Sequence, residues 1–314
     1  MTQVVTTVLY GLLQTSVFAL ISPAVIGTLQ WIKARLQLRQ GPPPWQLYLD
    51  LIKLLRLPPG LQPETTSWIY VISPFTVFIC YLLLALATPP FYLGFTLFDL
   101  VTVVYLLGLA RFTLALAGMD AGTPFGGMGS SREMFINVLA EPLLILIILA
   151  LTFQRHTTDL MGIVTTAFPP QQGISNPIFS LAALLLLWLA LAFVTIMDNG
   201  FLPIDNPSTH LELTMIQKAL HLEYSGRNLA LIEWGEAMRF TFFLTLLGDL
   251  LIARTTVPGG VLLPTLYVAK LLIGVVLLAM FEITQIKLRL RRVVIPWGAA
   301  LLLAIAATFL ASVH

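Results

Sequence analysis

The sequence has little charge and almost no cysteine for its length. Of its 314 residues, 10% are Asp, Glu, Lys or Arg, whereas 58% are hydrophobic and the mean hydropathy is +0.90. Soluble domains carry about 25% charged residues, so this composition excludes an ordinary soluble protein. The formal net charge of +2 is also too small to predict binding to nucleic acid.

Cys80 is the single cysteine, and it falls in an apolar run. One thiol can neither hold an iron–sulfur cluster nor form a disulfide within the chain. The sequence contains no HExxH motif, no P-loop and no GxGxxG before a helix. We therefore expect no metal site and no cofactor in this chain, and we expect any redox centres to belong to partner proteins.

The repeat His-Leu-Glu at 210–212 and again at 221–223 combines two residue types that ligate metals. Residues at positions i and i+2 do not face one another on a helix. Neither pair can therefore close on one ion, and the repeat does not predict a metal site.

Apolar runs of the length that crosses a bilayer, about 20 residues, recur along the whole chain. They predict an all-α integral membrane protein with about eight transmembrane helices, additional amphipathic cytoplasmic helices and one polytopic domain covering 1–314. The first run lacks a positive n-region and a clear cleavage site, so we expect it to be retained as a helix. The predicted spans are 5–31, 69–88, 95–117, 134–153, 178–197, 229–252, 262–282 and 293–312.

Lys and Arg are distributed unevenly between the two sets of loops. The loops after the first, third, fifth and seventh spans hold most of the basic residues, whereas the other side has Arg155 and Arg254. Basic loops are retained in the cytoplasm. We therefore expect both termini outside and residues 198–228 on the cytoplasmic side of a prokaryotic cytoplasmic (inner) membrane.

Residues 32–68 include a segment that is too short to cross the membrane. After the run Pro42–Pro44, apolar residues share one side and Asp50 and Lys53 lie three apart, which predicts an interfacial helix with an ion pair. The segment either packs on the lipid surface or forms a platform for a cytoplasmic partner. The residues that we assign to partner docking are Arg39, Trp45, Asp50, Lys53 and Arg132.

Residues 198–228 place many ionisable groups between two apolar spans and form a predicted acidic coupling loop. Stop signals predict a helix over Thr209–Tyr224, with Glu212 and Glu223 near the centre of its apolar face. If that face is buried, loss of hydration raises the pKa of both carboxyls and suits them to exchanging protons near neutral pH. They can equally pair with a neighbouring Lys or Arg and serve only to hold the helix down.

Two charged residues lie at similar depth in the third and fourth predicted spans. A charge inside the membrane needs a partner, so we predict an ion pair between Arg111 and Glu141. The pair is either part of a relay or an inert salt bridge. Further upstream, Ser130 and Glu133 have the spacing of a capping box, which predicts a helix start at that point.

The sixth predicted span carries three ionisable residues in its cytoplasmic half. Glu236 and Arg239 lie three apart and are expected to pair. Glu233 has no obvious local partner, which favours a role in a proton relay. Asp249 and Lys270 could extend the polar path, although we favour the alternative that Asp249 is solvated at the outer interface.

Four stretches resemble a known family: RQGPPPWQLYLDLIKLLR, TPFGGMGSSRE with the following Glu141-Pro142, PIDNPSTHLELTM, and HLEYSGRNLALIEW. They span most of the chain from Gly41 to Trp234. The chain resembles the multispanning subunit that joins the peripheral arm to the membrane arm in complex I and its relatives. It is most similar to the corresponding subunit of group 4 NiFe hydrogenases, such as formate hydrogenlyase and hydrogenase-4.

The resemblance implies an eight-helix subunit of a multisubunit oxidoreductase that links electron transfer to proton or sodium translocation. Its implied partners are hydrogenase-like large and small subunits, an iron–sulfur protein and antiporter-like membrane subunits, with the iron–sulfur and Ni-Fe centres in those partners. The coupling candidates carried over from the family are Glu141, Asp198, Asp205, Glu212, Glu223 and Glu233. Arg111, Glu236, Arg239 and Lys270 join them as intramembrane ionisable groups.

Three alternatives stay open. A complex I-like quinone oxidoreductase would use the same surface as part of a quinone site. A stand-alone ion transporter would suit charges near the middle of the membrane, although the two halves of the chain show no convincing repeat. A passive anchor would have every buried charge paired for structure.

Overall fold

The computed structural model describes residues 2–58, 67–87, 99–155, 157–165, 177–205, 216–251, 262–288 and 290–312. Within these ranges every regular element is helical, and the β-type pairing is limited to an isolated bridge between Asp99 and Asp159. The predicted all-α fold is confirmed. In chain order the helices are α1 (Thr2–Leu36), α2 (Gln46–Arg56), α3 (Trp68–Ala87), α4 (Leu100–Asp120), α5 (Pro124–Arg155), α6 (Leu160–Thr165), α7 (Pro177–Asp198), α8 (Gln217–His221), α9 (Gly226–Leu251), α10 (Leu262–Thr284) and α11 (Val294–Ser312).

Six of the described helices are long and apolar enough to cross a membrane: α1, α3, α4, α5, α7 and α10. Two more helices correspond to the remaining predicted spans. The apolar part of α11 is shorter, at Val294–Leu310, and α9 has 26 residues but carries several charges. Eight spans is therefore an approximate number, and the chain is a multi-pass membrane protein.

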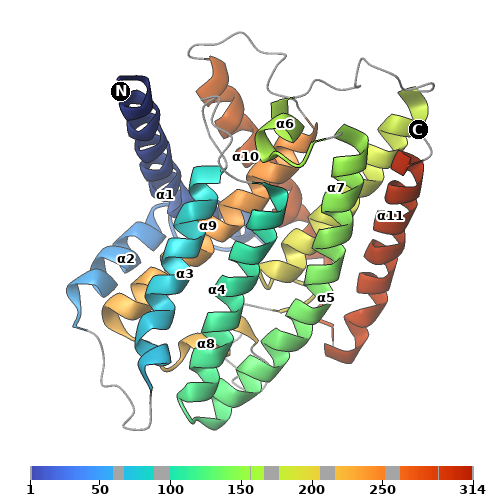
Figure 1. The fold of residues 1–314 in the computed structure, drawn as a ribbon. Coiled ribbons are helices and arrows are strands. Elements are labelled where there is room, and N and C mark those ends of the chain that lie inside the picture. Colours follow the sequence, from blue (N-terminus) through green and yellow to red (C-terminus); the bar gives the residue numbers. More distant parts are fainter. Residues whose placement is uncertain are drawn as a thin grey trace.

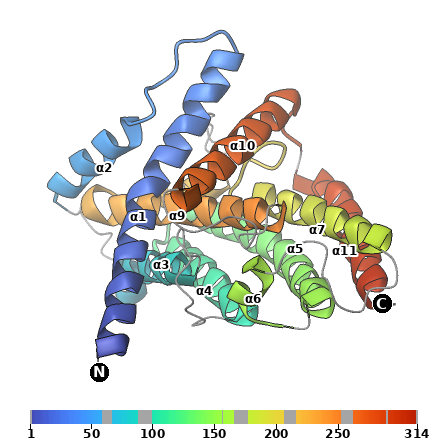
Figure 2. The ribbon, with the colours of Figure 1, turned by 90° about the horizontal axis from the view of Figure 1, so that it is seen from above.

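Helix α9 is the centre of the bundle. In Figure 1 it passes behind α3 and α4, which begin a row that continues through α5, α7 and α11, and Figure 2 shows it between α3 and α4 on one side and α10 on the other, with α1 crossing over it. Every residue from Ala237 to Leu247 is buried, so this part of α9 is covered on all sides. A helix that is covered all round can hold charged side chains away from lipid, provided that neighbouring helices supply their partners.

Apolar side chains pack α9 on both flanks. One cluster joins it to the row of helices and includes Leu107, Leu143 and Phe242. A second cluster joins it to α1 and α10 and includes Leu29 and Phe240. In a bilayer the lipid tails are as apolar as these side chains, so close packing and polar contacts hold the helices together.

The fourth predicted span begins earlier than the sequence indicated. Helix α5 starts at Pro124, and both residues of the predicted capping box lie inside it, so that prediction is wrong. The Ser130 hydroxyl lies 2.9 Å from the Ala115 carbonyl oxygen and 2.8 Å from that of Gly126. The first turns of α5 pack so closely on α4 that a Cβ at Gly126 would lie 2.3 Å from the Gly118 carbonyl oxygen.

The predicted helix Thr209–Tyr224 is partly outside the described residues, which resume at 216. In the described part, α8 ends at His221, so the predicted extension to Tyr224 is wrong. Contacts with α3 fix the chain after α8. The Tyr224 ring stacks on Tyr70 with the ring centroids 4.4 Å apart, and the Tyr70 hydroxyl donates to the Glu223 carbonyl oxygen at 2.7 Å.

The two ends of the chain lie on the same face of the bundle. The start of α1 and the end of α11 are at the top in Figure 1, whereas α8 and the turn between α4 and α5 are at the bottom. An even number of crossings produces this arrangement. The face that holds α8 is called the α8 face below.

Candidate functional site

The last residue of α7 is the centre of a buried ionic cluster. The Asp198 side chain is fully buried and accepts a hydrogen bond from Nη1 of Arg111 on α4. Its other oxygen lies 3.8 Å from Nε of Arg239 on α9. Asn137 on α5 accepts a second hydrogen bond from Arg111 Nη1, at 3.3 Å. Four helices therefore meet at this carboxylate.

The carboxylate partner of Arg111 is Asp198, so the predicted pair of Arg111 with Glu141 is wrong. Arg111 is 2% exposed and faces the interior of the bundle. Glu141 lies instead over the backbone of Gly108, where an added Cβ would be 3.3 Å from its Oε1. The two residues lie on neighbouring helices as expected, but their side chains lie on different faces of the helix pair.

A second carboxylate, Glu236, joins α9 to α8. It lies 3.8 Å from Arg239 Nη2, 3.4 Å from Lys218 Nζ and 3.2 Å from His221 Nε2. The predicted pairing of Glu236 with Arg239 is confirmed. Glu233 was expected to have no obvious local partner, and its Oε1 lies 3.9 Å from the Nζ of Lys218, which comes from a different helix, α8.

Gln217 connects α8 to the centre of the cluster. Its amide nitrogen donates to the backbone oxygen of Asp198 at 2.8 Å, and its amide oxygen accepts from Arg239 Nη2 at 3.4 Å. On its other side, Arg239 donates to the hydroxyl of Tyr81 on α3 at 3.3 Å and lies over that ring. A displacement of α8 would therefore change the hydrogen bonds that Gln217 makes with Arg239 and with the Asp198 backbone.

Glu133 on α5 also belongs to this cluster. From the sequence it was predicted to be part of a helix cap. It is 3% exposed, and its Oε2 has no hydrogen-bond partner. It interacts electrostatically with Arg111 and Arg239. One signal in the sequence could have found it, since Glu133 and Asn137 are four residues apart and share a helix face.

The charges of this cluster do not balance when all its carboxyl groups are ionised. The acids are Glu133, Asp198, Glu233 and Glu236, and the fixed cations are Arg111, Lys218 and Arg239. Among the described residues, four negative charges against three positive charges leave an excess of one. Binding of one proton at Glu133 removes that excess, which suits the cluster to proton uptake and release.

Lys218 is the member of the cluster nearest to solvent, with a side chain that is 36% exposed. Burial acts to lower the pKa of its ammonium group, but the carboxylates of Glu236 and Glu233 outweigh burial and raise it. Lys218 therefore stays charged, and it provides a fixed cation where the cluster meets the α8 face.

Other predicted coupling residues lie beside this cluster or outside the described residues. Asp205 is buried, accepts a hydrogen bond from the Ile216 amide at 3.1 Å and pairs with Lys287 at 2.9 Å. Lys287 is one of the basic residues in the loop after the seventh predicted span, and the sequence does not predict its pairing. Glu223 follows α8 and is partly exposed. Glu212 falls among residues 206–215, which the structure does not describe.

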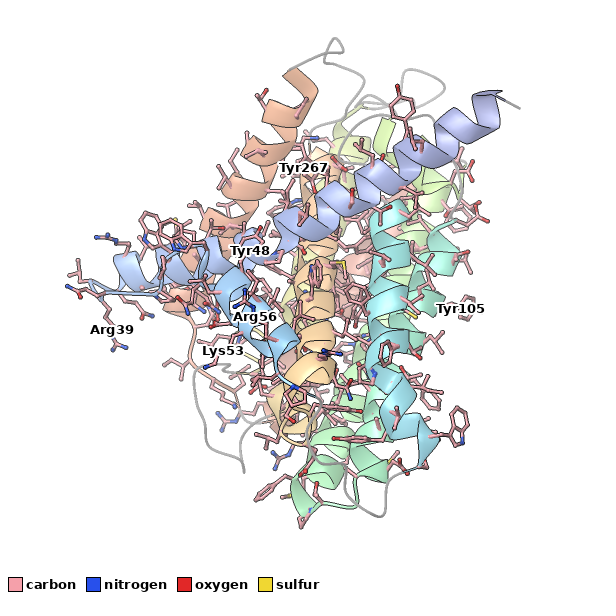
Figure 3. The ribbon with its side chains drawn as sticks, turned by 90° about the vertical axis from the view of Figure 1, so that its left-hand side faces the viewer. Arg39, Tyr48, Lys53, Arg56, Tyr105 and Tyr267 are labelled. Atoms are coloured by element: carbon pink, nitrogen blue, oxygen red, sulfur yellow. The ribbon has the colours of Figure 1, made fainter. Side chains whose placement is uncertain are left out.

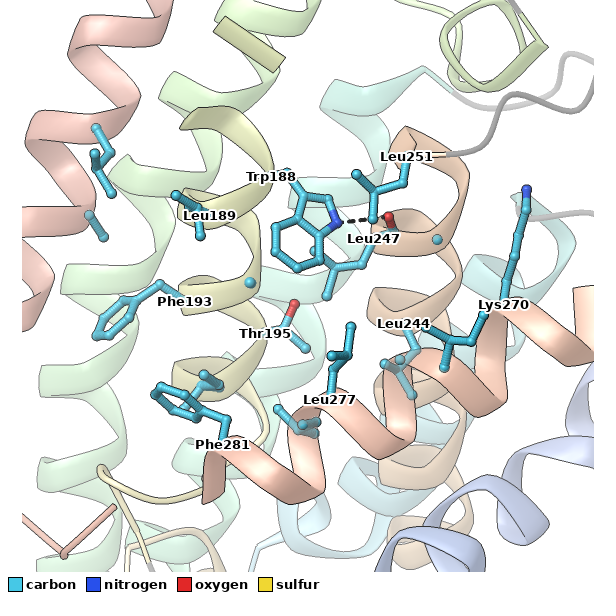
Figure 4. Close-up of a pocket in the computed structure, with 18 of the residues that line it drawn as sticks. Trp188, Leu189, Phe193, Thr195, Leu244, Leu247, Leu251, Lys270, Leu277 and Phe281 are labelled. Carbon is cyan, nitrogen blue, oxygen red and sulfur yellow. Dashed lines mark hydrogen bonds between the residues drawn. The ribbon is translucent and has the colours of Figure 1, made fainter. Parts of the chain in front are cut away.

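Asp249 and Lys270 form a separate buried pair between α9 and α10. The Lys270 ammonium donates to Asp249 Oδ1 at 3.0 Å, and both residues are less than 10% exposed. The expectation that Asp249 is solvated is wrong. Lys270 borders a cavity of about 490 Å³ with apolar walls, and Figure 4 shows its side chain directed away from Leu277 and Phe281 in those walls.

The predicted docking residues fall in two places. Arg39, Trp45 and Lys53 are exposed on the segment that includes α2, and Figure 3 shows Arg39 projecting away from the bundle. Asp50 accepts a hydrogen bond from Gln46 at 3.1 Å, and no ion pair joins it to Lys53 in this described segment, so that predicted pair is wrong. Arg132 lies on α5, in a different part of the fold.

Comparisons with known proteins cover nearly the whole chain. A family model described as NADH dehydrogenase matches residues 9–312. Formate hydrogenlyase subunit 4 of Escherichia coli is 33% identical over 291 residues, which are 90% of this chain and 92% of the relative. Hydrogenase-4 component C of Escherichia coli is 34% identical over 238 residues, which are 74% of this chain and 71% of the relative.

A solved structure gives the same fold. It belongs to the membrane-bound sulfane sulfur reductase, an archaeal respiratory membrane complex, and the match has a TM-score of 0.82. It covers 98% of this chain and 100% of that chain at 19% sequence identity. At this identity the match establishes the fold alone.

Proposed function

Because this chain belongs to the NADH dehydrogenase (complex I subunit 1) family, we propose that it is the energy-coupling membrane subunit of a complex I-related oxidoreductase of the hydrogenase type. Its relatives are named as a subunit of formate hydrogenlyase and a component of hydrogenase-4. The chain anchors the cytoplasmic redox subunits and passes changes in their charge to ion-translocating neighbours. The observation that carries this proposal is the buried acidic excess around Asp198.

The coupling step begins at the α8 face, where a charge change in a docked partner acts on Lys218 and Glu236. A displacement of α8 alters the hydrogen bonds of Gln217 to Asp198 and Arg239. Arg239 then shares its charge differently between Asp198 and Glu236. The proton that balances the cluster leaves or enters at Glu133. Two arrangements with different proton affinity are what such coupling requires.

The partners in this proposal are hydrogenase-like large and small subunits, an iron–sulfur protein and antiporter-like membrane subunits. Iron–sulfur clusters and a Ni-Fe centre belong to those partners, while this chain supplies the anchor and the proton-binding cluster. The α8 face is cytoplasmic and both termini are outside, in the inner membrane of a prokaryote. Asp205, Glu212, Glu223 and Glu141 stay candidates for further steps of the relay.

The first test is purification of the intact complex in mild detergent with measurement of bound nickel and quinone. Nickel together with a hydrogenase-like large subunit is the expected result. Quinone without nickel would identify the complex as a quinone oxidoreductase and overturn the hydrogenase part of the proposal. A chain that is active in liposomes without partners would overturn both and favour a stand-alone transporter.

The second test is the substitution Glu133→Gln, which keeps the size of the side chain and removes its titration. The number of ions moved per electron pair should fall about fivefold or more at unchanged assembly, a typical size for coupling between sites. Glu133→Asp, which retains a titrating carboxyl, should recover most of the ratio. An assembled Glu133→Gln complex with full ion coupling would remove Glu133 from the mechanism.

A further inference from the structure

A groove runs along the outer surface of the bundle between α4 and α5. Its volume is about 540 Å³, and its walls are apolar apart from the Glu141 carboxylate and the Tyr105 hydroxyl. The α4 wall includes Tyr105, Gly108 and Phe112, and the α5 wall includes Ile145. The groups that fill this groove in the membrane therefore determine whether the Glu141 carboxylate has a polar partner.

Glu141 has no hydrogen bond or ion pair with any residue in the described ranges, although it is partly buried. Gly108 makes the space for it, since a Cβ at that position would lie 3.3 Å from the Glu141 Oε1. Arg111 is the cation on α4 that is nearest in sequence to Gly108, and it pairs with Asp198 in the buried cluster. The carboxylate is therefore held at the surface of the chain without a partner from these helices.

The groove faces away from the centre of this chain. Tyr105 is 74% exposed, Ile145 55% and Phe112 50%. Figure 3 shows Tyr105 projecting from the side of the bundle opposite to Arg39 and α2. The apolar wall is therefore open to whatever lies beside this chain in the membrane.

The position of the groove along the helices places Glu141 near the middle of the bilayer. Gly108, which contacts it, is eight residues from the start of the 21-residue helix α4, or about 12 Å along its axis. Carboxylates at that depth face protein or a water-filled cavity, because lipid tails offer no hydrogen bonds. The apolar cavity of Figure 4 differs in this respect, since lipid tails can fill it without leaving a carboxylate unpaired.

We infer that the groove between α4 and α5 is the contact surface for a transmembrane helix of a neighbouring membrane subunit, which donates a hydrogen bond to Glu141. The neighbouring helix is apolar apart from one hydrogen-bond donor at the level of Gly108. Gly108 allows it to approach α4 closely, as small residues do at helix contacts in membranes. This inference rests on the proposed function in one respect, that the chain works inside a membrane complex.

Cross-linking in native membranes tests the contact without changing Glu141. Cys80 is the single cysteine of the sequence and is replaced first by Ser. Tyr105→Cys and Ile145→Cys then carry a thiol-attached photoreactive probe within the groove. Leu302→Cys on α11, which is 67% exposed, is the matched control on a different face.

We expect both groove positions to cross-link to the same transmembrane helix of one neighbouring subunit, and the α11 control not to reach that helix. The cross-linked peptide should contain a hydrogen-bond donor at mid-membrane depth. Products with lipid only, or with an apolar helix that has no donor, would overturn the inference. The readout does not depend on hydrogenase activity, nickel or ion transport, so it can fail or succeed independently of the proposed function.

Retention of the neighbouring subunit tests the carboxylate itself. Glu141→Leu should weaken its association with the neighbour about threefold to tenfold, the range of one hydrogen bond between membrane helices. Glu141→Gln still accepts a hydrogen bond and should retain most of the neighbour. Equal retention by the two variants, at equal levels of folded chain, would show that the carboxylate makes no contact.

Discussion

Two sets of buried charges in this protein differ in how completely they are satisfied. Asp249 and Lys270 meet at 3.0 Å and balance one another. Around Asp198, polar atoms of five described residues are buried without a hydrogen bond: Arg111 Nη2, Glu133 Oε2, Asp198 Oδ2, Arg239 Nε and His221 Nδ1. Burying polar atoms without hydrogen bonds is costly, because each gives up its hydration without a full replacement.

The difference separates a structural pair from a cluster that can rearrange. In the pair, Lys270 and Asp249 neutralise one another through a contact of 3.0 Å. In the cluster, Arg239 lies 3.8 Å both from Asp198 and from Glu236, so a small shift changes which carboxylate it neutralises. We therefore place the proton-coupling function in the cluster and a packing function in the pair.

The substitution with the largest expected effect is Asp198→Asn. It leaves Arg111 and Arg239 buried without the carboxylate that both face. Loss of one member of a buried ion pair costs about 3–5 kcal/mol, and we expect the upper end of this range because two guanidinium groups are affected. Thermal unfolding of the purified complex and its yield from membranes measure the loss.

Asp198→Glu is the matched control, since it keeps the negative charge and tests only the length of the side chain. It should assemble better than Asp198→Asn. If Asp198→Asn assembled with normal thermal stability, the cluster would not depend on Asp198, and the contrast between cluster and pair would collapse.

The general fold could be predicted from the sequence because membrane helices follow local rules. Apolar runs of bilayer length identified the helices, and an intramembrane charge by itself indicated where to search for function. Glu236 and Arg239 were paired correctly because both lie on one helix, where spacing determines contact.

The partners across helices could not be predicted, because they depend on rotation and packing. Arg111 and Glu141 share a depth, but Arg111 faces the bundle interior and Glu141 faces the outer groove. Glu133 matched the pattern of a helix cap, and the close packing of α5 on α4 moved the helix start to Pro124. A single sequence contains no direct signal for the rotation of a helix or for the packing of α5 on α4, although the spacing of Glu133 and Asn137 indicates that they share a helix face.

The next largest effect should come from Lys270→Met. It removes the ammonium group that pairs with the buried Asp249 carboxylate, at a cost of about 3 kcal/mol. The double substitution Lys270→Met with Asp249→Leu should recover most of that stability, because apolar groups of similar size often replace a buried pair at little cost. Thermal unfolding measures both variants.

Ion coupling in the assembled double variant distinguishes the two sets of charges. We expect the number of ions moved per electron pair to stay at the wild-type value. A loss of coupling despite restored stability would mean that the pair also carries protons, and the assignment of coupling to the cluster would then be too narrow.

The smallest effect should come from Glu233→Gln at the exposed edge of the cluster. Its partner Lys218 is 36% exposed and 3.9 Å away, and such exposed pairs contribute about 0.5 kcal/mol, less at high salt.

The effect should also depend on pH, because Lys218 has a raised pKa in the folded protein. The stability that its pairing contributes is fully present below the unfolded Lys pKa of about 10.4 and is lost as pH rises through the folded pKa. The difference in unfolding temperature between Glu233→Gln and wild type should therefore stay constant across about pH 6 to 9 and shrink in stronger alkali. If Glu233→Gln lowered the free energy of unfolding by several kcal/mol at neutral pH, Glu233 would belong to the buried part of the cluster and not to its exposed edge.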